Sequence, residues 1–121
     1  MARKKVEKLD KSFINYKGED YELVFNLNVM EDIQEQYGSV EAWGELVEAS
    51  AEPKAKDIKY GFTAMLNEGI DIYNEEHDDE EKRPFFTEKQ VGRIISEIGL
   101  LEAAKTLNKT VIDSTKSDEK N

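Results

Sequence analysis

One stretch in the middle of the chain constrains the fold more than any other. Residues 57–73, DIKYGFTAMLNEGIDIY, place their apolar side chains within an arc of about 120° when they are projected on a helix at roughly 100° per residue. The residues in this arc are Ile58, Phe62, Met65, Leu66, Gly69, Ile72 and Tyr73. The pattern predicts a core helix with one apolar face, which the rest of the chain must cover.

Two glycines in this stretch, Gly61 and Gly69, are unusual choices for a helix. Each costs about 1 kcal/mol relative to alanine in a helix interior, because glycine loses more backbone freedom on folding. We therefore expect another segment of backbone to pass close to the helix where these glycines lie.

Ahead of the central helix, alternating apolar residues predict a β-hairpin. Its strands are expected near residues 12–16 and 21–25, on either side of a polar turn that contains Gly18. The apolar residues that alternate are Phe13, Tyr21, Leu23 and Phe25. A two-stranded ribbon is marginally stable by itself, so it must pack on the helices that follow.

Cap residues mark the starts of three further helices. Asn26 precedes a helix over residues 27–37, Ser39 precedes a short helix that contains Trp43, and Thr87 begins a helix in a capping box with Gln90. Glycines follow the first and third of these helices, at positions 38 and 99. The expected buried face of the first helix consists of Leu27, Met30, Ile33 and Tyr37.

These patterns together predict an α+β fold that is mainly α-helical, with an N-terminal β-hairpin packed on a bundle of about five helices. We expect a single globular domain over residues 12–111, preceded by a flexible basic arm at residues 1–11. No apolar residue occurs from Asp113 to the last residue, so we expect residues 112–121 to form a disordered polar tail.

The composition argues against several classes of function. The chain has 27 Asp and Glu residues against 17 Lys and Arg, and a surface with a net charge of −10 repels nucleic acid. There is no cysteine and no long apolar run, so we expect neither a disulfide framework nor a membrane span. These features predict a cytoplasmic protein.

A search for catalytic and metal-binding residues finds no specific pattern. The single histidine, His77, lies in the acidic run EEHDDEEKRP at residues 75–84, which we expect to be an exposed, mobile loop. Without cysteine, a nucleophilic triad would have to be built around His77, and the acidic run lacks the glycine that an EF-hand loop requires. We expect no enzymatic activity, no metal site and no cofactor.

Three segments carry a resemblance to a known family. They are YELVFNLNVMEDIQEQYGS, YGFTAMLNEG and FTEKQVGRIISEIG, and together they extend over roughly residues 13–110. In content and order they resemble the tail assembly chaperones of long-tailed bacteriophages and of related prophages in Gram-positive bacteria. That family usually has a tryptophan or similarly bulky residue in the central helix, where this chain has Tyr60, Phe62 and Met65.

The resemblance implies a protein without enzymatic activity that acts in the cytoplasm of a bacterial host cell. Family members bind the tape-measure protein and keep it soluble while tail-tube subunits polymerise around it. They often occur also in a longer, frameshifted form whose extension recruits the tail-tube protein. Self-association of the chain is compatible with this role.

The expected binding surface lies where apolar residues crowd around Gly99. Ile94, Ile95, Ile98, Leu100, Leu101 and Leu107 lie too close together in sequence for one straight helix to bury all of them. We expect the partner-binding residues to be Ile95, Leu100, Leu101 and Leu107. The alternative is that a bend at Gly99 buries them all.

Two other functions stay open at this point. An acidic chain can inhibit a DNA-binding enzyme by mimicking nucleic acid, although mimicry requires carboxylates that are spaced like phosphates on an ordered surface. The chain can also be a small interaction module unrelated to phage tails.

Overall fold

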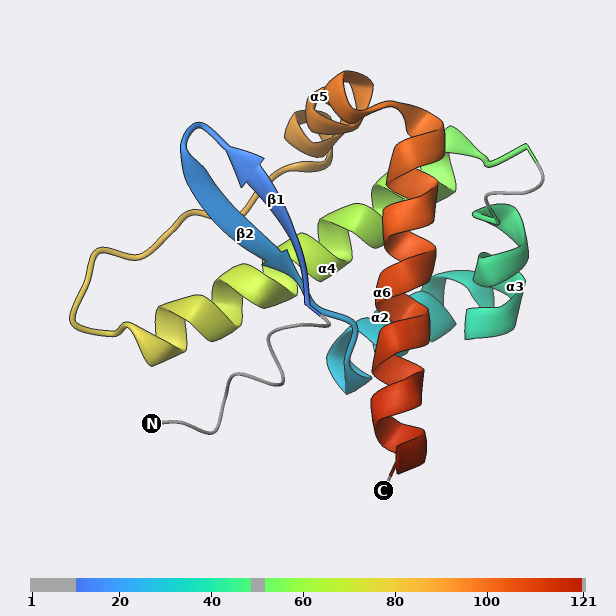
Figure 1. The fold of residues 1–121 in the computed structure, drawn as a ribbon, viewed down its shortest axis with the longest axis horizontal. Coiled ribbons are helices and arrows are strands. Elements are labelled where there is room, and N and C mark those ends of the chain that lie inside the picture. Colours follow the sequence, from blue (N-terminus) through green and yellow to red (C-terminus); the bar gives the residue numbers. More distant parts are fainter. Residues whose placement is uncertain (1–10, 49–51, 121) are drawn as a thin grey trace.

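The computed structural model describes residues 11–48 and 52–120, with the side chains of residues 116–120 excepted. Its elements are β1 (Ser12–Tyr16), β2 (Glu19–Leu23), α2 (Leu27–Tyr37), α3 (Val40–Leu46), α4 (Ala55–Glu76), α5 (Glu88–Ile98) and α6 (Leu100–Lys120). This order confirms the predicted α+β, mainly helical fold with its N-terminal hairpin (Figure 1). The predicted basic arm lies outside the described residues, except for Lys11.

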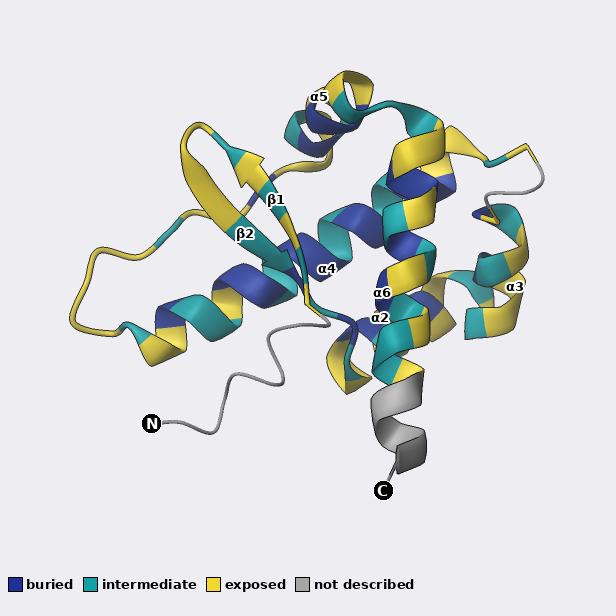
Figure 2. Ribbon diagram, in the orientation of Figure 1, coloured by how far each residue is buried: buried dark blue, intermediate teal, exposed yellow. Residues whose placement is uncertain are grey.

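The central helix is α4, and every other helix and strand β2 pack against it. It contributes more buried residues than any other element, visible as dark blue along the helix in Figure 2. The α4 side chains in the core are Ile58, Phe62, Met65, Leu66 and Ile70. Ile72 and Tyr73, which we expected in the buried face, are only partly buried, because the last turns of α4 are covered less completely than its middle.

Gly69 is the point where the hairpin crosses α4. A Cβ atom on Gly69 would overlap the backbone carbonyl of Glu22, and Val24 N donates a hydrogen bond to Met65 O at 3.2 Å. The expected close approach of backbone is therefore confirmed at Gly69. At Gly61 the expectation is wrong, because the space of a Cβ atom is filled by the indole ring of Trp43.

The hairpin turn is tighter than the sequence indicated. Lys17 and Gly18 have φ angles of 53° and 86°, which suit a two-residue turn of the type that favours hairpins, and β2 begins at Glu19 instead of residue 21. The register pairs Ile14 with Tyr21 and Phe13 with Glu22. Phe13 therefore lies on the opposite face from Tyr21 and is 52% exposed, although we expected it to alternate into the core.

The predicted caps form as expected. The side chain of Asn26 accepts a hydrogen bond from Val29 N, and that of Ser39 accepts one from Ala42 N. Thr87 and Gln90 form the complete capping box, with each side chain bonded to the other residue's backbone. These bonds satisfy N–H groups that a helix leaves without partners in its first turn.

The buried face of α2 differs from the expected one. Val29 and Ile33, one turn apart, are buried against the core, whereas Leu27 is 74% exposed. Leu27 lies about 200° around the helix from Val29, so both cannot face α4. The prediction of Leu27 as a core residue is wrong.

Helix α6 continues past residue 111, where we expected a disordered tail to begin. Its buried side includes Ala103, Ala104, Leu107 and Thr110, and the hydroxyl of Ser114 donates to the carbonyl of Phe25 at 3.1 Å. A helix that is anchored by its first half extends through polar residues at little cost, because each added residue gains a backbone hydrogen bond. The predicted tail is therefore wrong for the helical residues.

Candidate functional site

The corner between α5 and α6 holds the residues that the sequence singled out for partner binding. Gly99 has a φ angle of 102°, in the region that favours glycine, and it joins the two helices with no intervening loop. Gly99 N donates to Ile95 O at 2.7 Å, and Gly99 O accepts from Ala103 N at 2.9 Å. One residue thus ends α5 and starts α6 in a new direction (Figure 1).

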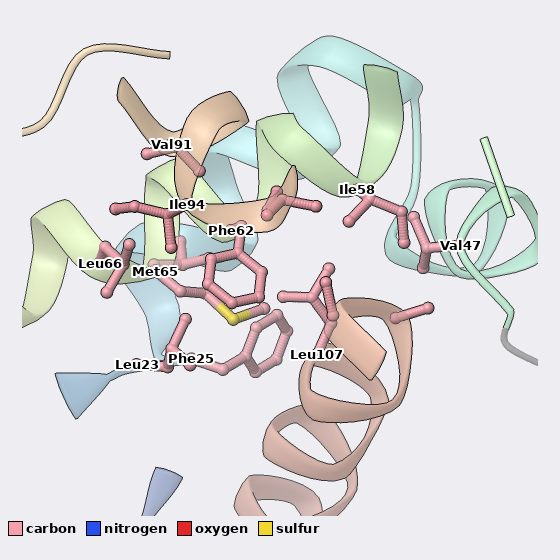
Figure 3. Close-up of a cluster of buried hydrophobic side chains, with 14 of the residues drawn as sticks. Leu23, Phe25, Val47, Ile58, Phe62, Met65, Leu66, Val91, Ile94 and Leu107 are labelled. Carbon is pink, nitrogen blue, oxygen red and sulfur yellow. The ribbon is translucent and has the colours of Figure 1, made fainter. Parts of the chain in front are cut away.

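The structure does not bring the four predicted site residues together on one surface. Ile95 and Leu107 are buried in the core, where Figure 3 shows Leu107 among the apolar side chains, so neither offers surface to a partner. Leu100 is half-buried and packs against the same core. Leu101 is 51% exposed. The change of direction at Gly99 buries part of the apolar cluster and leaves Leu101 outside.

A second exposed apolar residue, Ile112, lies on the same side of α6. Residues 101 and 112 are about three turns apart and differ by roughly 20° around the helix axis. Ile112 is 56% exposed, and exposed Lys105 lies between the two on this side. We call Leu101, Lys105 and Ile112 the α6 outer stripe. Ile112 was not among the predicted site residues, because the globular domain was expected to end at residue 111.

A groove beside α4, which we call the acidic groove, has four carboxylates in its lining. It has a volume of about 410 Å³ and lies between α2, α4 and the start of α5. The ring of Tyr60 lines it, with its hydroxyl donating to Asp32 O at 3.1 Å, and Phe85 lines it as well. The carboxylates in the lining are those of Asp32, Glu68, Asp71 and Glu88.

Burial and nearby carboxylates raise the pKa of two tyrosines beside this groove. Burial raises the pKa of Tyr60, and the charges of Asp32, Glu88 and Glu35 raise it further. The pKa of Tyr37 is also raised, first by burial and then by the hydrogen bond that its hydroxyl donates to Asp57 at 2.6 Å. Both phenols therefore stay neutral well into the alkaline range, and the groove offers a partner carboxylates and neutral aromatic rings.

The acidic run after α4 is exposed, as expected, but its first residues belong to the helix and its last part is hydrogen-bonded to it. Residues 75 and 76 complete α4, and the carboxylates of the run are all exposed. Arg83 closes the loop, because Arg83 N donates to Asn74 Oδ1 at 2.9 Å and Asn74 Nδ2 donates to Arg83 O at 3.1 Å. The Arg83 guanidinium also stacks 3.8 Å over the Tyr73 ring and pairs with Glu19 at 2.8 Å.

His77 contacts the last turns of α4. Its ring stacks on Tyr73 with 3.9 Å between centroids, and its Nδ1 lies 2.9 Å from Tyr73 O. Among the side chains that the structure describes, in residues 11–48 and 52–115, no three from histidine, aspartate or glutamate are grouped so that they could hold a metal ion. The contacts of His77 are those of a residue that ends a helix.

Neutralising the acidic run is expected to leave the fold intact. With Glu75 and Glu80 replaced by Gln, and Asp78 and Asp79 by Asn, the free energy of unfolding should change by less than about 0.5 kcal/mol or rise. The reason is that exposed like charges gain nothing from compaction, and the amide oxygen introduced by Glu80→Gln can still accept the hydrogen bond from Tyr73. Urea denaturation measures the change, and a loss of several kcal/mol would show that the run supports the structure.

Comparisons with known proteins were made by family, by curated sequence and by solved structure. No family model matches the chain, and the searches of curated proteins and of solved structures found no match either. In the part of the chain that the structure describes, no helix has both the length and the apolar character needed to cross a membrane.

Proposed function

We propose that this protein is a phage tail assembly chaperone, which binds the tape-measure protein and assists tail-tube polymerisation in the bacterial cytoplasm. The observation that carries the proposal is the α6 outer stripe, where Leu101 and Ile112 stay exposed on one side of a long helix. The resemblance of three sequence segments to that family supports it.

The α6 outer stripe suits a helical partner. Its two apolar side chains are separated by about 16 Å along the helix, at 1.5 Å per residue, which is the spacing of residues on one face of an amphipathic helix. A coiled segment of a tape-measure protein offers such a face, and helix-in-groove binding uses anchors at this periodicity. The net charge of −10 keeps the complex soluble while the apolar surfaces are in contact.

Leu101→Asp tests this placement of the binding surface. Because Leu101 is half-exposed, the variant should fold, with a circular dichroism spectrum like that of the unmodified protein and a free energy of unfolding within about 1 kcal/mol of it. It should fail to keep a co-expressed tape-measure protein in the soluble fraction, since a charge then replaces an apolar contact.

Leu27→Asp is the matched control for this experiment. It is the same substitution at a residue that is more exposed and that lies on α2, away from the α6 outer stripe. It should leave solubilisation unchanged. Solubilisation by Leu101→Asp at the level of the Leu27→Asp control would refute the proposed surface.

The acidic groove supports a second candidate, an acidic inhibitor that occupies a basic site on another protein. Its four carboxylates lie on an ordered surface of α2, α4 and α5, whereas the acidic run after α4 is an exposed loop. Affinity purification separates the two functions. A chaperone should recover a long helical protein, and an inhibitor should recover a basic nuclease or polymerase.

A further inference from the structure

One edge of strand β1 has no backbone partner among the described residues. The hairpin is a sheet of two strands, and β2 is flanked by β1 on one side and by α4 on the other. In the described part of the chain, residues 12–16 make no backbone hydrogen bonds other than those of the β1–β2 pair. An edge of this kind presents a row of free N–H and C=O groups to any extended segment.

A groove runs along this free edge. It has a volume of about 290 Å³, and its lining comes from Phe13, Ile14, Asn15 and Tyr16 of β1, Ile94, Glu97 and Ile98 of α5, and Thr106 of α6. Side chains alternate between the two faces of a strand, so four consecutive residues line one groove only where the strand edge faces it. The groove therefore combines unpaired backbone groups with apolar side chains.

The edge also lacks the features that normally prevent strand pairing. Many natural edge strands carry charged side chains, proline or bulges, whereas the five residues of Ser12–Tyr16, SFINY, contain no charge and no proline and pair with β2 in regular register; α5 and α6 line the edge but leave the groove open. Phe13, the second residue of the strand, is 52% exposed. Strand β2, with the sequence EDYEL, carries three carboxylates.

We propose that this edge is a docking site for an extended segment of another protein, which adds to the hairpin as a third strand beside β1. Residues 11–17 contain Lys11 and Lys17 and no carboxylate. Lys11 is paired with Glu22 of β2 at 3.8 Å, so Lys17 is the charge that a partner can meet, and the segment that fits carries carboxylates toward one end. Glu97 lines the groove itself, so the middle of the segment is apolar and uncharged. Strand β2, which pairs with the other edge of β1, likewise contains both acidic and apolar residues, so its sequence is a starting point for a peptide that pairs with β1.

A second copy of this chain fits the edge less well. Two β1 strands that pair in antiparallel fashion about Ile14 place Lys11 of one copy opposite Lys17 of the other, at both ends of the pair. Like charges directly opposite one another destabilise a sheet. The partner is therefore a different polypeptide, and its site is separate from the α6 outer stripe.

The probe for this site is a fluorescein-labelled peptide with the sequence of residues 19–25 in which Gln replaces the central Glu22, EDYQLVF. Fluorescence anisotropy measures its binding to the full chain. The matched control is the same peptide with N-methyl groups on alternate residues, which removes N–H donors and keeps every side chain. If the peptide adds as a strand, the N-methylated form should bind at least tenfold more weakly, because main-chain hydrogen bonds supply much of the affinity in strand addition.

Variants of the protein locate the site. Phe13→Glu should weaken binding at least tenfold, since it removes an apolar contact and repels the acidic peptide. Phe13→Ser is the second variant, which keeps the test valid if the added charge disturbs the hairpin. Leu101→Asp should leave peptide binding unchanged, which distinguishes this site from the chaperone surface. Hydrogen exchange should slow at amides of β1 in the presence of the peptide.

Four results would overturn the proposal. The first is no binding at millimolar peptide, and the second is equal binding by the N-methylated form. The third is faster hydrogen exchange at residues 19–23 on adding peptide, which would show that the peptide displaces β2. The fourth is a dimer of the unliganded chain that Phe13→Glu dissociates in sedimentation, because a second copy would then occupy the edge.

Discussion

Gly69→Ala is expected to lower the free energy of unfolding by about 3 kcal/mol, the upper end of the usual cost of overpacking a core. The added methyl group would overlap the carbonyl oxygen of Glu22, which belongs to the backbone and cannot rotate away. Relief requires β2 to move off α4, and that movement would lengthen the 3.2 Å hydrogen bond from Val24 N to Met65 O. Urea denaturation followed by circular dichroism measures the loss.

Gly44→Ala is the control for this prediction. Gly44 lies in helix α3, and a Cβ atom built there meets no other atom within 4 Å. The same substitution should therefore raise the free energy of unfolding by about 0.5–1 kcal/mol, because alanine is the better helix former. If the two variants were equally stable, the hairpin would not cross α4 at Gly69.

Phe62→Ala is expected to cost about 3–5 kcal/mol, the range for removing a buried phenylalanine side chain. Phe62 is fully buried on α4, and Figure 3 shows its ring within the cluster that β2, α5 and α6 also supply. The cavity left behind touches several elements at once, so no single segment can move to fill it. Chemical denaturation gives the magnitude.

Phe85→Ala provides the comparison at the surface. Phe85 is 55% exposed at the rim of the acidic groove, so its truncation should change the free energy of unfolding by less than about 0.5 kcal/mol. A loss of similar size in both variants would contradict the arrangement of the core around Phe62.

Leu101 and Phe13 allow the two proposed surfaces to be tested separately. Each is about half-exposed, and they lie on different elements, α6 and β1. The lining of the β1 groove does not include Leu101. Leu101→Asp should therefore lose tape-measure solubilisation but keep peptide binding, and Phe13→Glu should lose peptide binding but keep solubilisation.

Local signals in the sequence determined where α2, α3 and α5 begin and where α2 and α5 end. Asn26, Ser39 and the pair Thr87 and Gln90 act on backbone N–H groups within three residues, and Gly99 acts through its own φ angle. The periodicity of residues 57–73 likewise depended only on helix geometry, and it predicted most of the buried face of α4. Interactions of such short range can be predicted from the sequence without knowing which helices or strands pack nearby.

Only the tertiary structure decided which apolar residues stay at the surface. Leu27 and Leu101 have the same side chain as Leu107, and what separates them is the direction in which α2 and α6 run against α4. The hairpin register was also decided by the tertiary structure. The turn has two residues instead of the expected four, so β2 starts earlier and Phe13 lies outside the core. The physical reason is that burial depends on contacts between segments far apart in sequence, and no periodicity within one segment records the angle at which another will cross it.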